Sequence, residues 1–240
     1  MRTAVISDIH GNLAAFEAVL ADLRLTSPDL IFHGGDLAAG GSSPVEIVDQ
    51  IRDLGWQGVM GNTDELLFAP QALTEFAGQS PAHYQPLFAA IGEMAVVTRA
   101  ALGEERLAWL SQLPPTQIYE SVALVHAKPG DLWRAPPPEA ADEELESAYQ
   151  PLAQPIAIYA HIHRSYVRRT SQLTVVNTGS VSLSYDGDAR ASYLLLDDSK
   201  PVIRRVEYDA AREIESLRRF GMPHVDWIAK TLTTGTFQMP

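Results

Sequence analysis

The feature that most limits the possible folds is an alternation of apolar and amphipathic segments at the N-terminal end of the chain. Asn12 can cap one helix, and Ser43-Pro44 can open another that closes at Gly55. Strands that alternate with helices form right-handed crossovers in a parallel sheet, so this part of the chain is predicted to be an α/β unit. Three short apolar segments rich in β-branched residues predict its strands: residues 3–7, 30–33 and 57–60.

The middle and the end of the chain have a different pattern. Residues 64–113 are rich in Ala and Leu and predict a helical insertion, whereas the prolines of residues 128–138 predict a long irregular loop. Successive short strands without intervening helices favour antiparallel pairing, which predicts a second, mixed sheet. These strands are predicted at 116–120, 122–127, 155–160, 165–169, 173–176, 192–197 and 202–207.

No repeat and no linker interrupts the pattern. We therefore predict a single domain over residues 1–240, with a helical insertion at about 64–113. Residues 209–220 and 225–234 predict two closing helices, which make up a C-terminal helical tail at about 209–240.

Composition excludes several classes of partner and chemistry. Eighteen Lys and Arg against 30 Asp and Glu give a net charge of −12, which disfavours nonspecific binding to nucleic acid or to an anionic membrane. The absence of cysteine excludes disulfides, thiolate metal sites and cysteine nucleophiles. The sequence has no run of about 18 apolar residues, so no membrane span is predicted. The first residues predict a strand rather than a signal peptide. We expect a soluble, cytoplasmic protein.

Side chains that commonly bind metals follow the predicted strands at the point where each strand ends. The carboxyl ends of neighbouring strands meet at one edge of a sheet, where α/β proteins place their sites. Carboxylate, amide and imidazole ligands suit Mn, Fe, Zn, Co or Ni better than Ca²⁺ or a copper–thiolate site. The candidate ligands are Asp8, His10, Asp36, Asn62, His126, His161 and His163.

Seven ligands are too many for one tetrahedral ion and suit two ions that share a carboxylate. Two ions about 3.5–4 Å apart lower the pKa of a shared water and hold the attacking and leaving oxygens of a phosphoryl group. The alternative for Asp8 and Asp36 is helix capping or a turn, but burying either carboxylate after an apolar strand without a cation is costly. The sequence thus predicts a phosphoester hydrolase.

Six short segments, in order along the chain, resemble the motif series of the calcineurin-like metallophosphoesterases. The similarity extends through the C-terminal strands, and the chain looks most like the small YfcE-like branch of that superfamily. The resemblance implies a four-layer α/β/β/α sandwich of two mixed sheets with the site at one rim. The segments are DIHGN at 8–12, GGD at 34–36, GNTD at 61–64, VHAKP at 125–129, AHIH at 160–163 and NTGS at 177–180.

The resemblance also implies how the ligands are shared. Asp8, His10, Asp36 and His163 would hold one ion, and Asp36 would bridge to a second ion held with Asn62, His126 and His161. The expected cofactors are two divalent transition-metal ions, with Mn expected and Fe, Zn, Ni or Co as alternatives. A metal-bridging hydroxide would attack phosphorus in line, with Asn62 and His126 as catalytic ligands and Asp64 orienting its neighbours.

Four positions depart from the family pattern. Thr63 stands where many relatives have a histidine that donates a proton to the leaving group, and threonine cannot do so at neutral pH. Ala127 and Ala160 replace glycines that are usual in the family, and Thr178 replaces a common proline. Each of these three is tolerated if its φ angle is negative.

The expected substrates are small or nucleotide-like phosphoesters, cleaved as by a phosphodiesterase or a phosphatase. Alternatives are a protein phosphatase or a dinucleoside-polyphosphate hydrolase with the same site, or a non-catalytic metal-binding scaffold; a homo-oligomer is also possible. For Trp133, Arg134 and Arg164 the sequence leaves two interpretations open, a substrate contact and a structural role. His33 is expected to be structural.

Overall fold

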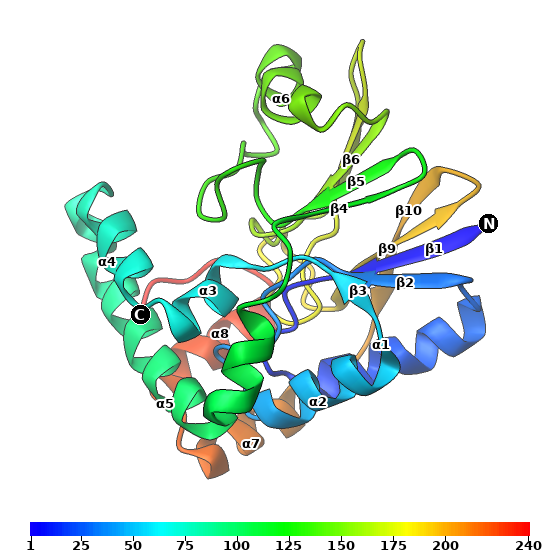
Figure 1. Cartoon of the computed structure of the whole chain (residues 1–240). Coiled ribbons are helices and arrows are strands. Elements are labelled where there is room, and N and C mark those ends of the chain that lie inside the picture. The colour runs from blue at the N-terminus through cyan, green and yellow to red at the C-terminus, as the bar shows by residue number, and fades with distance from the viewer.

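The computed structural model describes residues 1–240 and contains two sheets of five strands each (Figure 1). In the first sheet the strand order is β10-β9-β1-β2-β3, with β1, β2 and β3 parallel and β9 antiparallel to β1. Its strands are β1 Arg2–Ile6, β2 Leu30–His33, β3 Gln57–Gly58, β9 Ala191–Asp197 and β10 Lys200–Val206.

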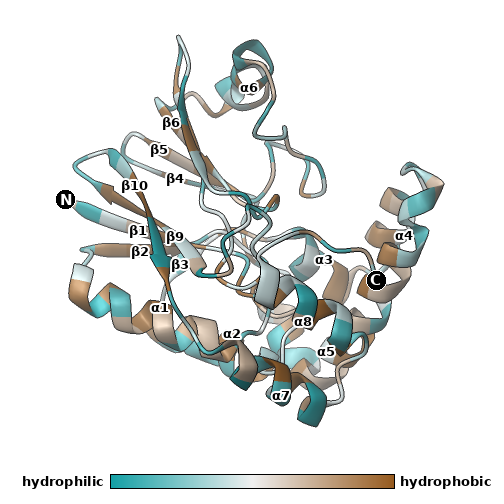
Figure 2. Ribbon diagram, turned by 180° about the vertical axis from the view of Figure 1, so that it is seen from behind, coloured by the Kyte–Doolittle hydropathy of each residue, from teal (hydrophilic) through white to brown (hydrophobic).

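The second sheet has the strand order β4-β5-β6-β8-β7 and is also mixed. Here β5, β6 and β8 are parallel, and the edge strands β4 and β7 are antiparallel to their neighbours. The central strands β5 and β6 are mostly hydrophobic (Figure 2). Its strands are β4 Thr116–Tyr119, β5 Val122–Val125, β6 Ile156–Tyr159, β7 Tyr166–Arg169 and β8 Thr174–Asn177.

Three apolar layers hold the two sheets and their helices together. Side chains alternate along each strand, so Val5 packs toward the second sheet while Ala4 and Ile6 pack toward the helices. Helices α1 (Leu13–Thr26) and α2 (Pro44–Leu54) contribute to the core on the outer face of the first sheet. Helix α6 (Asp142–Tyr149) contributes to the core on the outer face of the second sheet. The predicted α/β fold with a four-layer sandwich of two mixed sheets is confirmed.

The cap residues set the helix boundaries where the sequence predicts them. The Asn12 side chain accepts a hydrogen bond from the backbone N–H of Ala15, which starts α1. Gly55, with a φ of 66°, ends α2 in the left-handed conformation. At the C-terminal end, α7 (Ala210–Phe220) and α8 (Val225–Thr234) match the two predicted closing helices.

The segment that connects β3 of the first sheet to β4 of the second is helical. It contains α3 (Asn62–Phe68), α4 (Gln71–Gly78), the 3₁₀ helix η1 (Ala82–Tyr84) and α5 (Gln85–Leu110). By length and composition, Ala82–Leu110 could cross a membrane, and 33% of its most apolar window is buried. A core helix of a soluble protein meets the same criterion, and α5 packs against α2, α3 and α4. The absence of a membrane span stays a prediction.

Three elements differ from the prediction. Strand β3 ends at Gly58 rather than at residue 60, because the backbone N–H of Met60 donates to Pro114 outside the sheet. The sequence analysis also missed α6 (Asp142–Tyr149) and the 3₁₀ helix η2 (Gln150–Leu152). Helix α6 buries only Leu145 and Tyr149, and a single apolar pair gives no detectable periodicity.

Candidate metal centre

Five of the seven candidate ligands have a left-handed backbone conformation. They lie in the loops that follow β1, β2 and β6, with φ angles between 48° and 66°. Non-glycine residues rarely adopt this conformation, which costs about 1–3 kcal/mol and is concentrated at functional sites. The turns place successive side chains on the same side of the sheet edge. The five residues are Asp8, His10, Asp36, His161 and His163.

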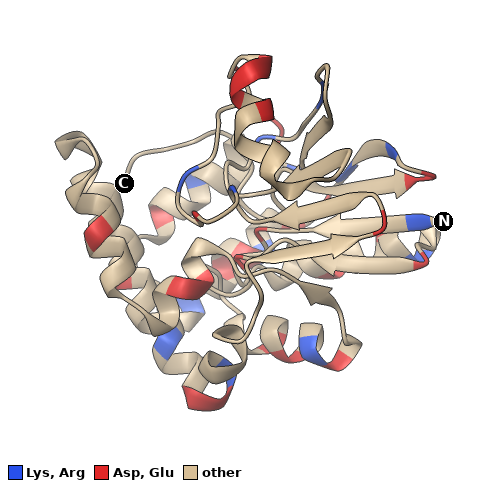
Figure 3. Cartoon of the chain, turned by 45° about the horizontal axis from the view of Figure 1, so that its top comes forward, with Lys and Arg blue, Asp and Glu red and all other residues tan.

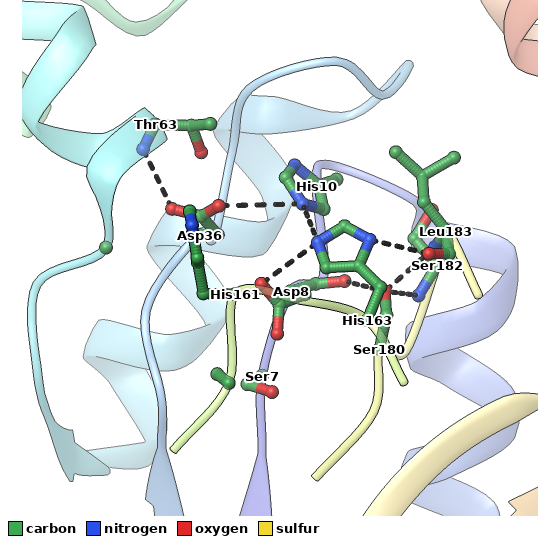
Figure 4. A network of polar contacts seen from close by, with 12 residues as sticks. Ser7, Asp8, His10, Asp36, Thr63, His161, His163, Ser180, Ser182 and Leu183 are labelled. Atoms are coloured by element: carbon green, nitrogen blue, oxygen red, sulfur yellow. Dashed lines mark hydrogen bonds and ion pairs between the residues drawn. The ribbon is translucent and has the colours of Figure 1, made fainter. Parts of the chain in front are cut away.

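One group of ligands forms a compact, buried cluster. Asp8, His10, Asp36 and His163 each offer one ligand atom, and these atoms lie within 4.8 Å of one another. Nε2 of His163 is 3.3 Å from Nε2 of His10 and 3.2 Å from Oδ1 of Asp8 (Figure 4). Nε2 of His10 is 3.7 Å from Oδ2 of Asp36.

The remaining three ligands lie on the other side of Asp36. Oδ1 of Asn62, at the start of α3, is 2.8 Å from Nε2 of His126 and 2.9 Å from Nδ1 of His161. Nε2 of His126 is 3.6 Å from Oδ1 of Asp36. One oxygen of Asp36 therefore faces His10 and the other faces His126. The structure brings all seven side chains to one place.

Backbone carbonyls orient three of the histidines. A carbonyl oxygen only accepts hydrogen bonds, so the Nδ1 atom next to it carries the proton and Nε2 keeps a lone pair that faces the cluster. Two such lone pairs 3.3 Å apart repel each other unless a proton or a cation lies between them. The Nδ1 distances are 2.8 Å for His10 to Ala39, 2.8 Å for His126 to Gly34 and 2.5 Å for His163 to Leu183.

The carboxylate of Asp8 gives a second indication of a cation. Asp8 is buried, and neither of its oxygens has a hydrogen-bond partner. An ionised carboxylate without a partner is unstable inside a protein, whereas a metal ion would satisfy both oxygens. Together with the imidazole and amide donors around it, this residue fits a divalent transition metal.

Burial and neighbouring charges favour the metal-binding protonation states of Asp8, His10 and His161, but not that of His126. Burial holds the pKa of His10 below its usual value and lowers that of His161 to about 4. Burial alone would raise the pKa of Asp8, but the histidines around it, His163 first, together outweigh burial and hold that pKa below its usual range. Burial likewise opposes protonation of His126, but the surrounding carboxylates, Asp36 first, and the Gly34 carbonyl together outweigh burial and raise the pKa of His126. Neutral imidazoles and ionised carboxylates are the ligand forms.

Asp64 lies behind Asp36 and holds its loop. Its carboxylate accepts hydrogen bonds from the backbone N–H groups of Asp36 at 2.8 Å, Leu37 at 2.9 Å and Gly61 at 3.0 Å. Burial, followed by the charge of Asp36, raises the pKa of Asp64 to about 6. A Cβ atom at Gly61 would lie 2.1 Å from Oδ1 of Asp36, so only glycine lets α3 approach this closely.

The segment after β8 connects the loops that carry the ligands. Ser180 Oγ donates to the carbonyl of Asp8 at 2.9 Å, and Asn177 Nδ2 donates to the carbonyl of Ala160 at 2.6 Å. The sequence analysis assigned no role to these two residues, although both lie in the NTGS motif that it recorded. Ala127, Ala160 and Thr178 all avoid positive φ angles, so these replacements are tolerated as expected.

A cavity of about 290 Å³ opens over the cluster. Its floor includes His10, Asp36, Thr63 and His161, while α4, α5, α8 and the C-terminal segment supply its walls. Another cavity, of about 260 Å³, lies beside Met1 and contains none of the seven ligands.

The structure settles the positions of the residues whose roles were open. Trp133 lines the cavity, where its Nε1 donates to Glu65 at 2.7 Å. Arg134 does not line the cavity; its guanidinium lies over the ring of Phe76, 4.9 Å from the centroid, and donates to Gln79. Arg164 pairs with Glu139 at 3.0 Å. His33 is buried, has no hydrogen-bond partner and does not line the cavity.

The sequence analysis missed the apolar walls of the cavity. Trp227 and Phe237 come from the C-terminal end, and Phe76 and Phe88 come from the insertion. Their wall positions depend on how α4, α5 and α8 pack, so no local motif could have revealed them.

A buried glutamate supports the loop next to His10. Glu213 on α7 is 2% exposed and accepts hydrogen bonds from Ser42 N at 3.0 Å and Ser42 Oγ at 3.1 Å. The adjacent Gly41 packs so closely against the backbone that a Cβ would lie 2.0 Å from the carbonyl of His10. Burial raises the pKa of Glu213 to about 7 from its ordinary value of 4.5.

Glu213 is expected to make the protein less stable as the pH rises. Between pH 4.5 and 7 the folded state retains a proton on Glu213 that the unfolded state has lost. The contribution of Glu213 to the free energy of unfolding therefore decreases by up to ~3 kcal/mol over this range. Glu213→Gln cannot ionise and should lack this dependence. Its stability relative to wild type should therefore increase between pH 4.5 and 7.5 in urea unfolding experiments. The exposed change Glu104→Gln is the matched control. A difference between Glu213→Gln and wild type that stays constant with pH would contradict the assignment.

Comparison with known proteins places this geometry in context. Residues 1–200 match the family model described as the calcineurin-like phosphoesterase superfamily domain. An uncharacterized protein of Methanocaldococcus jannaschii is 30% identical over 257 residues, which cover 97% of each chain. A metallophosphoesterase structure from Sphaerobacter thermophilus is 26% identical, has a TM-score of 0.78, and aligns over 98% of this chain and 99% of its own.

Two named phosphoesterases also match, each with a weaker relation. The symmetrical bis(5'-nucleosyl)-tetraphosphatase of Cronobacter sakazakii is 28% identical over 165 residues, which cover 67% of this chain and 54% of that protein. The YfcE phosphoesterase of E. coli is 18% identical with a TM-score of 0.48, and the alignment covers 86% of this chain and 100% of that one.

Proposed function

We propose, since this chain belongs to the calcineurin-like phosphoesterase superfamily and is a hydrolase of phosphoester bonds, that it uses two metal ions to cleave small phosphoesters. The observation that carries this proposal is the position of Asp36. Its two oxygens lie 3.7 Å from Nε2 of His10 and 3.6 Å from Nε2 of His126, so one carboxylate faces both ligand groups. A carboxylate shared in this way is what a dinuclear site needs.

The chain's own residues would hold and orient the reacting groups. Bound at this site, two divalent ions would polarise a phosphoryl group and lower the pKa of a water molecule. Asn62 presents its Oδ1 atom between His126 and His161, and Asp64 fixes the backbone of Asp36. Thr63 donates its backbone N–H to Oδ1 of Asp36 at 2.9 Å. Its hydroxyl cannot protonate a leaving group at neutral pH, which favours esters whose leaving groups depart as anions.

Chelation is the direct test of metal dependence. Treatment with EDTA should abolish hydrolysis of bis-p-nitrophenyl phosphate, because the ligands alone cannot activate water, and Mn²⁺ should restore it. EDTA presaturated with Mn²⁺ controls for inhibition by the chelator, and circular dichroism controls for unfolding. Hydrolysis that continues in protein shown to be free of metal would refute the mechanism.

Hydrolysis of dinucleoside polyphosphates is a second candidate. The similarity to the tetraphosphatase of Cronobacter sakazakii supports it, and the same site chemistry could cleave a phosphoanhydride. Turnover of diadenosine tetraphosphate by the Mn²⁺-loaded protein tests it. Manganese as the native ion, a cytoplasmic location and homo-oligomer formation stay predictions.

A further inference from the structure

We propose that the site takes phosphate esters that carry a single phosphoryl group and an apolar, aryl-type substituent. This inference rests on the proposed function and names its substrate class. It is carried by the contrast between the floor and the walls of the cavity. The floor gathers the metal-ligand side chains, and the walls are apolar and carry no basic residue.

The walls come from three separate parts of the chain. Helices α4 and α5 contribute Phe76, Leu87 and Ile91, and α8 with the C-terminal segment contributes Ile228 and Phe237. The loop at 128–138 adds Trp133, whose ring centroid is 5.2 Å from that of Phe76. A flat apolar group can be buried between these surfaces. Walls with these side chains favour an apolar substituent, because its transfer from water into the cavity lowers the free energy.

No Lys or Arg lines the cavity to hold additional phosphates. Residues 53–98, which include α4 and the first half of α5, contain no Lys or Arg (Figure 3). Lys128 and Arg134 lie beside Asp131 at 3.7 Å and 3.5 Å, and neither lines the cavity. A dinucleoside tetraphosphate has several negative charges beyond the phosphate at the metals. In a protein of net charge −12 these charges would lack partners.

The polar atoms of the wall tryptophans are already in use. Nε1 of Trp133 donates to Glu65, and Nε1 of Trp227 donates to the carbonyl of Gln238 at 2.9 Å. The walls offer few other polar side-chain groups that could hydrogen-bond to a ribose or a base edge. The main ones are the hydroxyls of Thr231 and Tyr185. The cavity volume of about 290 Å³ is also at the small end of the range for ligand sites, about 300–1,000 Å³. These features favour a compact apolar group over a nucleotide.

A series of ligands with one phosphoryl group each tests the preference without turnover. Methylphosphonate, phenylphosphonate and AMP should be titrated into the Mn²⁺-loaded protein. Binding is measured by the change in tryptophan fluorescence, since Trp133 and Trp227, two of the four tryptophans, line the cavity. Phenylphosphonate should bind roughly 10- to 100-fold more tightly than methylphosphonate, because only its ring leaves water. It should also bind at least several-fold more tightly than AMP.

A single substitution in the wall tests where this preference arises. Leu87 lines the cavity but belongs to none of the apolar core clusters, so Leu87→Lys adds a cation without removing a core contact. The variant should bind phenylphosphonate about tenfold more weakly and AMP more tightly. Leu25→Lys makes the same change at a side chain that is 84% exposed on α1, and it should alter neither affinity.

The outcomes separate this inference from the proposed function. Equal affinity for the phenyl and methyl compounds, or a preference for AMP, would overturn the apolar substrate class even in an active enzyme. Unchanged selectivity in Leu87→Lys would do the same. If metal-loaded protein prefers phenylphosphonate but hydrolyses no phosphoester, the proposed function fails. Faster turnover of diadenosine tetraphosphate than of aryl esters would overturn the inference alone.

Discussion

Asp36→Asn is expected to lower kcat/KM for bis-p-nitrophenyl phosphate by about 10³-fold or more. The carboxylate lies between the two ligand groups, so losing its charge weakens both ion sites at once. Asparagine keeps an oxygen that can accept the hydrogen bond from the backbone of Thr63, so the loop and the start of α3 should remain in place. The loss should therefore come from metal binding rather than from unfolding.

Metal content and activity should be measured together in this variant. We expect fewer than two ions per chain by elemental analysis and a melting temperature of the metal-free protein close to wild type. Asp53→Asn makes the same chemical change at an exposed position of α2 and should retain both ions and full activity. An Asp36→Asn protein that keeps two ions and wild-type kcat/KM would show that this carboxylate is not shared.

Thr63→His is expected to increase activity selectively on esters with poor leaving groups. The Thr63 hydroxyl lies at the cavity floor, is buried and has no hydrogen-bond partner. The substitution therefore removes no side-chain hydrogen bond. An imidazole there could protonate a departing alkoxide, a contribution worth about 10²–10⁴-fold in general acid catalysis. Esters of p-nitrophenol should gain little, because p-nitrophenolate leaves without protonation.

The measurement is the dependence of log kcat on the pKa of the leaving group, from p-nitrophenol through phenol to alkyl alcohols. Wild type should show a steep decrease, and Thr63→His a shallower one. Thr63→Asn is the matched control, since it adds bulk and polarity without an acid, and its slope should equal that of wild type. Parallel gains on all esters would refute the proton-donor explanation.

The secondary structure was largely predictable because its signals are local. Asn12 and Gly55 fix helix ends through their own backbone and side-chain chemistry, and the structure confirms both. The alternating apolar strands predicted two mixed sheets for the same reason. The failures occurred where the deciding contact is distant. Met60 leaves the sheet to bond Pro114, and α6 has only Leu145 and Tyr149 buried against the second sheet.

For the site, the sequence by itself determined the chemical identity of the ligands and their order along the chain. Asp8, Asp36 and His126 follow apolar strands, and neighbouring strand ends must converge, so the cluster could be inferred before any coordinates. Only the tertiary structure decided how the ligands face one another, because the distances from Asp36 to His10 and His126 depend on left-handed turns in separate loops.

The walls of the cavity depended on the tertiary structure even more completely. Phe237 and Phe76 are far apart in the sequence and line one cavity only because α8 and the insertion fold over the same sheet edge. Apolar side chains can pack against many different partners, since the hydrophobic effect has no direction, and a sequence does not say which surfaces meet. Strand ends and caps act through local geometry, and therefore the sequence specified the ligands while the packed structure specified what surrounds them.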